Sequence, residues 1–302
     1  MANVLVVGSL VYDSITTPFG KAENTLGGSA NYFSLAASLF SDVRVVGVVG
    51  DDYLETDKAL LKGRNVDLAG LQQVRGGKTF RWEGKYEGDM NEAQSLKTDL
   101  NVFADFNPEL PSQYHDSRFV FLANIAPELQ LRVMEQVQDP LFVGMDTMNF
   151  WIHSKMSELK KVIAKVPMVL LNETEAQMIT DAPNAIDAAP RLAAMGPKYV
   201  VIKRGEYGFV LYSEGQFFML PAVPITDVVD PTGAGDSFAG GVFGYLAGLK
   251  RKPEFQDLKE ACVQGTVVAS FTIQGFGVQS LAALTKAKFT ERLAVYRRAT
   301  TL

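Results

Sequence analysis

The sequence has very few of the side chains that build disulfides and zinc sites. Only one of its 302 residues, Cys262, is a cysteine, so no disulfide can form within the chain and no cysteine cluster can hold a metal. The two histidines, His115 and His153, lie far apart and lack the spacing of a metal-binding pair. We therefore expect no zinc site, and we interpret Cys262 as a buried residue of a helix.

Long apolar runs and blocks of like charge are also missing. No run approaches the length of a membrane span, and Met1–Gly8 has no basic segment followed by a long apolar one. The formal net charge is −5, and no basic block is present that could follow the phosphates of a nucleic acid. We expect a cytoplasmic protein that binds small molecules, and neither a membrane nor a nucleic acid.

What the sequence does contain is a regular alternation of short apolar runs and helix-like stretches. Hydrophobic residues make up 47% of the chain, enough for a full core. The alternation predicts an α/β fold, with a mostly parallel sheet covered by helices on both faces. The predicted strands are Val4–Val7, Val43–Val49, Phe119–Leu122, Leu141–Val143, Met168–Leu171 and Tyr199–Ile202.

Two segments, approximately 10–26 and 76–100, interrupt this alternation. The alternating residues from Thr79 to Tyr86 predict strands of a small, separate sheet. We find no internal repeat, low-complexity tract or long linker, and Lys286–Leu302 is typical of a helix with a frayed end. We expect one domain over residues 1–302, with these two insertions.

The most informative segment is Asp230–Phe238, with the sequence Asp-Pro-Thr-Gly-Ala-Gly-Asp-Ser-Phe, just before a predicted helix at Phe238–Leu249. Gly233 and Gly235 allow a tight turn whose backbone N–H groups point at one spot, which would suit a phosphoryl group. Asp236 would lie beside that spot, where it could take the proton of an attacking hydroxyl group. A bare pair of glycines is more often only a turn, and it is the longer string that favours a kinase.

This string resembles the C-terminal signature of the ribokinase-like (PfkB) sugar kinases, and further motifs follow in family order from Gly8 to Ser280. The resemblance implies a three-layer α/β/α sandwich whose two insertions form a β-lid over the sugar site. It also implies transfer of phosphate from ATP to an alcohol group of a small sugar. The amides of Gly233, Ala234 and Gly235 would form the anion hole, and Asp236 would be the catalytic base. Several family members form dimers through their lids, so a homodimer is a further expectation.

Acceptor binding is implied for two segments near the N-terminus. Asp13 follows the first strand where the family places an aspartate that binds two sugar hydroxyls. Taken alone, Asp13 is more often a turn or cap residue. The run Gly27-Gly28-Ser29-Ala30-Asn31 resembles the family's Gly-Gly…Asn signature, whose residues hold the acceptor. Tyr32 and Phe33 stand where the family commonly has small residues, which leaves the identity of the sugar open.

Nucleotide and metal binding are implied at the ends of two later strands. Asn172 and Glu175 match the family's Asn-x-x-Glu motif, which orders Mg²⁺, its waters and phosphate, although an Asn before acidic residues is also a common helix cap. Gly205 and Gly208 resemble the family's nucleotide-binding Gly-x-x-Gly loop. Lys203 replaces a threonine that usually precedes this loop, and it would add charge near the ATP phosphates or stay at the rim.

Three further assignments rest on the resemblance. Thr232 is expected beside the ATP phosphates. Asp230, and Ser280 in the loop Gly275–Ser280, are expected at a monovalent-cation site, which makes activation by K⁺ a hypothesis. The run Gly47–Asp52 resembles the family's strand-end motif, in which an aspartate caps the next helix.

The acceptor and the class of protein each keep alternatives. A small sugar ranks first as acceptor, and a nucleoside second, because Phe80, Trp82 and Tyr86 of the predicted lid could stack on a base. A non-catalytic ligand-binding or regulatory protein on a kinase scaffold is the alternative of another class. A NAD-dependent oxidoreductase is disfavoured, since Gly8-Ser9-Leu10-Val11 is not G-x-G-x-x-G.

Overall fold

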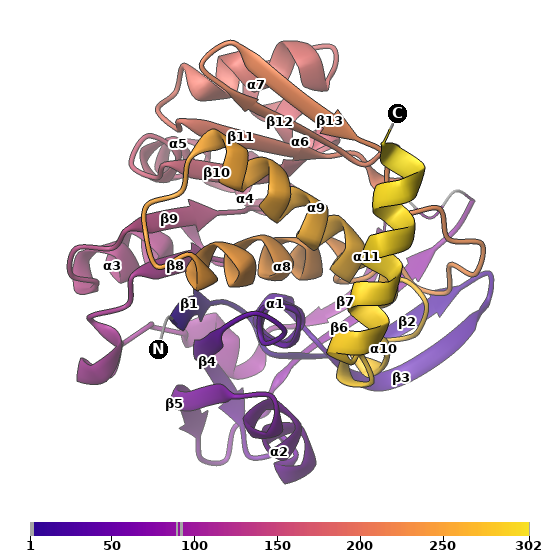
Figure 1. Ribbon diagram of the computed structural model, residues 1–302. Coiled ribbons are helices and arrows are strands. Elements are labelled where there is room, and N and C mark those ends of the chain that lie inside the picture. The colour runs from indigo at the N-terminus through magenta and orange to yellow at the C-terminus, as the bar shows by residue number, and fades with distance from the viewer. Residues whose placement is uncertain (1–2, 89, 91–92, 302) are drawn as a thin grey trace.

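The computed structural model describes residues 3–88, 90 and 93–301. In this part of the chain one sheet of nine strands runs through the middle of the molecule (Figure 1), in the order β13-β12-β11-β10-β9-β8-β1-β4-β5. Its pairs are parallel, except β11 with β12 and β12 with β13. The strands are β1 (Asn3–Val7), β4 (Asp42–Gly50), β5 (Val66–Val74), β8 (Phe119–Leu122), β9 (Phe142–Met145), β10 (Met168–Asn172), β11 (Tyr199–Lys203), β12 (Phe209–Ser213) and β13 (Gln216–Leu220).

Helices cover both faces of this sheet. One face carries α1 (Ser29–Ala37), α2 (Glu55–Gly63), α8 (Ala234–Gly248), α9 (Phe255–Thr272), α10 (Gln279–Ala282) and α11 (Lys286–Thr300). The other carries α3 (Pro127–Gln136), α4 (Asn149–Ser154), α5 (Met156–Ile163), α6 (Glu173–Thr180) and α7 (Ala185–Ala193). Short 3-10 turns lie at Asn101–Asp105, Ser112–Tyr114 and Gly205–Tyr207. No helix of the described residues is long and apolar enough to cross a membrane.

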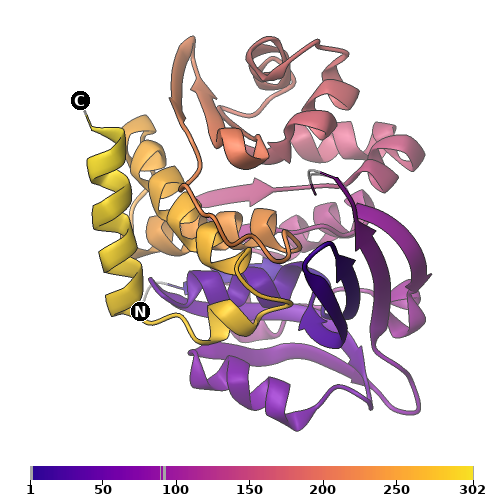
Figure 2. The ribbon, with the colours of Figure 1, turned by 90° about the vertical axis from the view of Figure 1, so that its right-hand side faces the viewer.

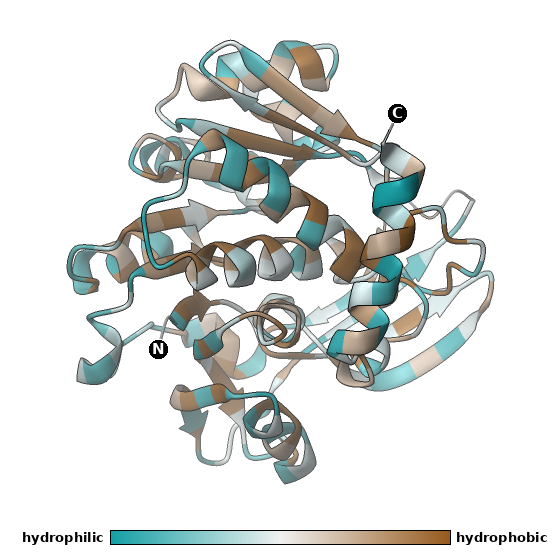
Figure 3. Cartoon of the chain, viewed as in Figure 1, coloured by the Kyte–Doolittle hydropathy of each residue, from teal (hydrophilic) through white to brown (hydrophobic). Residues whose placement is uncertain are grey.

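Each face of the sheet has its own hydrophobic core, because successive side chains of a strand point to opposite faces. In β1, Val4 and Val6 join the core under α1, α8 and α9, whereas Leu5 and Val7 join the core under α3, α5 and α7. In Figure 3 strands such as β9 and β11 are coloured as mostly apolar, as buried strands are expected to be. The observed layers confirm the predicted three-layer α/β/α sandwich.

A second sheet of four strands forms the lid, in the order β3-β2-β6-β7. Its strands are β2 (Val11–Thr17), β3 (Gly20–Gly27), β6 (Phe80–Tyr86) and β7 (Ala93–Asp99), which fall in the two segments predicted to leave the βα alternation. Figure 2 shows this sheet standing over one edge of the large sheet. The alternation of Thr79–Tyr86 is therefore confirmed as a strand of a small sheet.

The lid lies against the body of the protein. Ile15 and Tyr86 of the lid are buried and pack against Val228 and Phe276 of the body. The N–H group of Val278 also donates to the carbonyl oxygen of Leu26, at the end of β3, over 3.1 Å. The space under the lid is therefore shielded from solvent.

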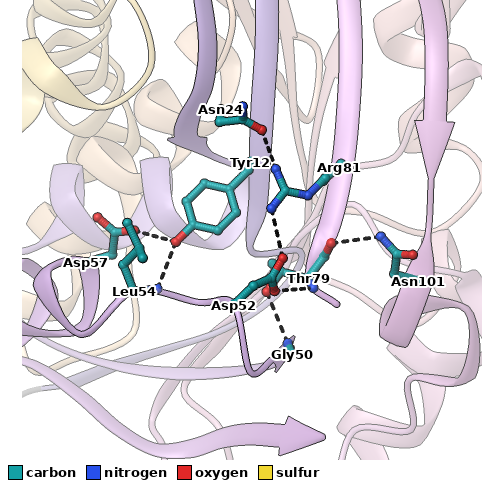
Figure 4. A network of polar contacts seen from close by, with 9 residues as sticks. All are labelled: Tyr12, Asn24, Gly50, Asp52, Leu54, Asp57, Thr79, Arg81 and Asn101. Carbon is teal, nitrogen blue, oxygen red and sulfur yellow. Dashed lines mark hydrogen bonds and ion pairs between the residues drawn. The ribbon is translucent and has the colours of Figure 1, made fainter. Parts of the chain in front are cut away.

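The root of the lid is held by Asp52, the aspartate that the sequence assigned to a helix cap, and that assignment was wrong. The residue before α2 is Leu54, and no side chain caps this helix. Instead, Asp52 accepts the N–H group of Thr79 over 2.7 Å and the guanidinium of Arg81 over 2.8 Å (Figure 4). Asp52 therefore does not cap α2. It holds Thr79, the residue before β6, and Arg81 within β6.

Candidate active site

The predicted site residues converge on the edge of the sheet that the lid covers. Asn172 and Lys203 are the last residues of β10 and β11, and the strand register places them side by side. Parallel strands end at the same edge, so residues that follow other strands gather there as well. Asp13 reaches the same region from β2 of the lid, and Asp236 from α8.

The turn before α8 presents backbone donors at this edge. Helix α8 begins at Ala234, four residues earlier than predicted, so Asp236 lies in its first turn and not before it. Gly233 adopts φ 74°, a left-handed conformation that glycine takes without strain. Among the described residues, no acceptor is found for the N–H groups of Gly233, Gly235 and Asp236, whereas that of Ala234 donates to the Pro231 carbonyl over 3.1 Å. Unpaired N–H groups at a helix N-terminus suit an anion.

Asp236 has the protonation behaviour of a base near neutral pH. Burial raises the pKa of its carboxyl group to about 6, although the ammonium of Lys203 opposes this shift. At pH 7 the carboxylate is therefore mostly ionised, and it still binds a proton more readily than an exposed aspartate.

Asp13 is a second buried carboxylate, on the lid side of the site. Only 4% of the residue is exposed, and burial together with Asp230 and Asp236 raises its pKa to about 8. A Cβ atom at position 27 would lie 1.9 Å from Asp13 Oδ2, so the glycine there makes room for the carboxylate. Asp13 and Gly27 thus lie side by side, with Gly28 next to them at φ 90°.

Asn31, in contrast, has partners within the protein at both ends of its amide. Its Nδ2 donates to the carbonyl oxygen of Gly27 over 2.6 Å, and its Oδ1 accepts from the hydroxyl of Tyr53 over 3.1 Å. The side chain is 1% exposed. In this arrangement Asn31 holds the turn at Gly27, and one amide hydrogen and one lone pair of Oδ1 are left for an acceptor molecule.

A hollow of about 380 Å³ opens at the ends of β10 and β11. Three of the residues predicted to bind nucleotide or phosphate line it, namely Asn172, Lys203 and Gly205. Gly208 lies behind it, where β12 begins, and Thr232 lies under the lid, where its hydroxyl donates to that of Tyr86 over 3.1 Å. The hollow therefore gathers three of the five residues that the family resemblance assigned to nucleotide or phosphate.

Lys203 reaches from β11 to the N-terminus of α8. A Cβ atom on Gly235 would lie 2.9 Å from Lys203 Nζ, so the ammonium group lies directly beside the turn. No carboxylate oxygen of the described residues lies within 4.0 Å of it. Burial raises the pKa of Asp146, Glu175 and Asp236, and the ammonium of Lys203 opposes this rise in each of them. Lys203 therefore lies among three buried carboxylates.

The Asn172 and Glu175 side chains form a capping box at the start of α6. Asn172 Oδ1 accepts the N–H group of Glu175 over 2.7 Å, and Glu175 Oε2 accepts that of Asn172 over 2.8 Å. The helix-cap interpretation is thus observed, and it leaves Asn172 Nδ2 and Glu175 Oε1 for other partners. Burial raises the pKa of Glu175, and Lys203 partly opposes it.

Asp146 and Thr147 are site residues that the sequence analysis missed. They follow β9 at the same edge, and Asp146 Oδ1 and Thr147 Oγ1 are buried without a hydrogen-bond partner in the described residues. Burial and the nearby Asp236 raise the pKa of Asp146 well above its usual value. The strand predicted at Leu141–Val143 ends two residues too early. Its correct end at Met145 would have placed Asp146 at the strand terminus, where ligand-binding residues are expected.

The two residues predicted at a cation site are in different surroundings. Asp230 is 0% exposed, and its two carboxylate oxygens accept the N–H groups of Thr232 over 2.9 Å and Gly277 over 3.4 Å. Ser280 lines another hollow, of about 590 Å³, between α11 and the segment of Ile225. In the described part of the chain no hydrogen bond joins Ser280 to Asp230.

Comparison with known proteins agrees with this geometry. The profile of a family described as pfkB family carbohydrate kinase matches residues 1–285. A cytidine kinase of Thermococcus kodakarensis is 32% identical over 257 residues, which are 83% of this chain and 90% of that protein.

Two solved structures show the fold. A nucleoside kinase of Methanocaldococcus jannaschii, described as an archaeal member of the ribokinase family, has a TM-score of 0.77 at 20% identity, over 98% of this chain and 99% of the other. A fructokinase of Vibrio cholerae, solved with fructose, ADP and calcium, has a TM-score of 0.78 at 17% identity, over 97% of this chain and 99% of the other. At these identities the likeness concerns the fold alone.

Proposed function

The chain belongs to the pfkB family of carbohydrate kinases, and from this premise we propose that it transfers the γ-phosphoryl group of ATP to the hydroxymethyl group of a nucleoside. The observation that carries the chemistry is the position of Asp236, in the first turn of α8 beside unpaired N–H groups and Lys203. The sequence alone ranked a simple sugar ahead of a nucleoside. The similarity to a cytidine kinase over most of both chains supports the nucleoside.

Asp236 acts as the general base in the proposed reaction. The acceptor oxygen attacks the γ-phosphorus, its proton passes to the Asp236 carboxylate, and the bond from the γ-phosphorus to the bridging oxygen of ADP breaks. A pKa of about 6 suits this role, because the group is ionised at neutral pH and still accepts a proton. ADP leaves from the hollow at the ends of β10 and β11.

The charge that develops during transfer is met by this chain's own donors. The N–H groups of Gly233 and Gly235 and the ammonium of Lys203 converge on the turn before α8. Positioned donors of this kind stabilise the transferring group more than water does, since they need no reorganisation. Ala234 would first have to give up its bond to Pro231.

The donor set fits Mg²⁺, the cation that kinases use with ATP. Asp146 Oδ1 is buried without a partner, and Glu175 uses only one carboxylate oxygen in the capping box. Mg²⁺ takes few protein oxygens and keeps several waters, so Asp146 and Glu175 suffice to hold it. When bound, it would offset the negative charge of the β- and γ-phosphates. Activation by K⁺ stays a prediction of the family resemblance.

The test is turnover of ATP to ADP, with Mg²⁺ and K⁺, against a panel of nucleosides, pentoses, hexoses, sugar acids and sugar phosphates. The Asp236→Asn variant is the control. We expect turnover with a nucleoside, and a loss of about a hundredfold to ten-thousandfold in the variant, because a positioned base is worth that much. ATP binding and folding should be retained.

The other outcomes distinguish the alternatives. Full activity of Asp236→Asn would remove this residue from the mechanism. Turnover with a sugar alone would restore the first acceptor ranking. ATP binding without turnover across the whole panel would favour a non-catalytic ligand-binding or regulatory protein.

A further inference from the structure

Tyr32 is a buried tyrosine whose hydroxyl group has no partner. It lies in α1, and only 1% of the residue is exposed. Its ring packs against the turn before α8, since a Cβ atom on Gly233 would lie 2.4 Å from three of the ring carbons. Among the described residues, no hydrogen bond is found for its Oη.

The surroundings of this hydroxyl are the residues of the acceptor side of the site. The charges of Asp13, Asp230 and Asp236 act on Tyr32 and, after burial, raise its pKa well above the usual value. Tyr86, on the lid, is the fourth neighbour that acts on it. Tyr32 therefore lies near the carboxylate expected to bind the acceptor and the carboxylate expected to take its proton, with its ring on the turn before α8.

An unpaired buried hydroxyl is costly, so its presence calls for a partner that arrives later. Leaving such a group unsatisfied costs about 1–3 kcal/mol, and phenylalanine would fill the same space without that cost. Other buried tyrosines nearby are satisfied: Tyr12 donates to Asp57 over 2.6 Å, and Tyr53 donates to Asn31 over 3.1 Å. Tyr32 differs from both, because no protein acceptor is found for its hydroxyl among the described residues.

We infer that the Tyr32 hydroxyl donates a hydrogen bond to a ring hydroxyl of the acceptor, the same hydroxyl that donates to Asp13. The inference rests on the proposed function. In its ionised form Asp13 only accepts hydrogen bonds, whereas the tyrosine hydroxyl can donate, so the pair contacts both the hydrogen and the lone pair of one acceptor hydroxyl. The site thereby selects acceptors with an intact ribose diol over their deoxy analogues, since a missing hydroxyl leaves both groups unpaired.

The test compares Tyr32→Phe with the unaltered protein, using ATP with cytidine, 2′-deoxycytidine and 3′-deoxycytidine. The variant keeps the ring against Gly233 and removes only the unpaired oxygen. We expect kcat/KM for cytidine to fall about tenfold or more, as loss of a bond to a buried group should, with the KM for ATP unchanged. With one of the two deoxy analogues the variant and the unaltered protein should perform equally, because the partner hydroxyl is absent there.

Stability gives the second readout, with Tyr114→Phe as the matched control. Tyr114 is also fully buried, but its hydroxyl donates to the carbonyl of Asp67 over 2.9 Å, in the other core. We expect Tyr32→Phe to unfold at the same or a higher denaturant concentration, whereas Tyr114→Phe unfolds at a lower one with unchanged acceptor kinetics. A purely structural role for Tyr32 would instead destabilise its variant and leave the acceptor kinetics alone.

The two proposals fail in different ways. If the unaltered protein phosphorylates cytidine and Tyr32→Phe matches it, the inference about Tyr32 is overturned and the proposed function stands. The inference is likewise overturned if the loss in the variant is equal for cytidine and both deoxy analogues. If a free pentose is the acceptor, ribose and its 2- and 3-deoxy forms replace the nucleosides. No turnover with any acceptor would overturn the proposed function, and with it the inference.

Discussion

At the scale of single residues, the protonation of the buried carboxyl groups of this site is coupled to folding. Asp13 has an ordinary value of 3.8 and a pKa of about 8 in the folded protein, chiefly because burial disfavours its charge. A raised pKa means that the folded protein binds the proton more tightly than the unfolded chain. Asp13 therefore costs stability whenever it is ionised, which is the expected penalty of holding a binding carboxylate in a dry site.

The corresponding prediction concerns stability against pH. Tighter proton binding by Asp13 in the folded protein contributes to the free energy of unfolding. This contribution is fully present below the unfolded-state pKa of 3.8 and is lost as the pH rises to about 8. Asp13→Asn should therefore be more stable than the unaltered protein at pH 8, with little difference at pH 4. Denaturant unfolding at both values measures this. Equal differences at the two pH values would mean that Asp13 is not the buried acid described here.

At the scale of elements, the lid depends on its root. Asp52, at the end of β4, holds the backbone of Thr79 and the side chain of Arg81, so one side chain links the large sheet to β6. The Arg81 and Asp52 side chains are 35% and 30% exposed, so solvent screens the ion pair. The link thus contributes to the position of the lid more than to the stability of the whole fold.

We predict that Asp52→Ala loosens the lid. Amide hydrogens of β6 should exchange faster, while the free energy of unfolding falls by no more than about 1 kcal/mol, the usual limit for an exposed pair. Glu87→Ala is the control, because Glu87 pairs with Lys85 at the far end of β6, away from the root. Unchanged exchange in Asp52→Ala, or equal changes in both variants, would contradict the role of Asp52.

The elements also show how far the sequence could predict this protein. Buried parallel strands were found because their apolar, β-branched runs are unambiguous, as in Met168–Leu171. β5 was missed, since polar residues interrupt its apolar pattern. The β12–β13 hairpin was missed although both of its strands carry apolar runs. The start of α8 was placed at Phe238 and not at Ala234, because Gly235 and other glycines are weak helix formers in isolation.

Contacts between distant segments could not be predicted in the same way. The motifs located Asp236, Asp13 and Lys203, yet nothing local to Tyr32 indicates that its hydroxyl would face them. That position depends on how α1 packs against α8, which brings Tyr32 onto Gly233. Asp146 was missed for a simpler reason, an error of two residues in the end of its strand.

The whole molecule combines a covered sheet with a lid whose outer strands, β3 and β7, pair with no further strand in the described part of the chain. The lid sheet ends in β3 on one side and β7 on the other, and Phe19 and Leu96 on these outer parts are 65% and 56% exposed. Exposed apolar side chains and open strand edges favour pairing with another chain. A homodimer clasped through the lid remains a prediction.

This prediction is measured by light scattering of the purified protein. We expect twice the mass of one chain, and the mass of a single chain for Leu96→Lys, because a charge on the clasped surface opposes pairing. Glu158→Lys, on the body helix α5, should leave the mass unchanged. A monomeric unaltered protein would contradict the clasp.

The burial of Cys262 makes the motion of the lid accessible to spectroscopy. This cysteine lies inside α9 at 0% exposure, and burial raises the pKa of its thiol, so it will not react with maleimide or iodoacetamide dyes in the folded protein. A Phe19→Cys variant would therefore carry one reactive thiol, on the exposed turn of the lid between β2 and β3. A fluorophore attached there would report opening and closing directly, without first removing any native cysteine.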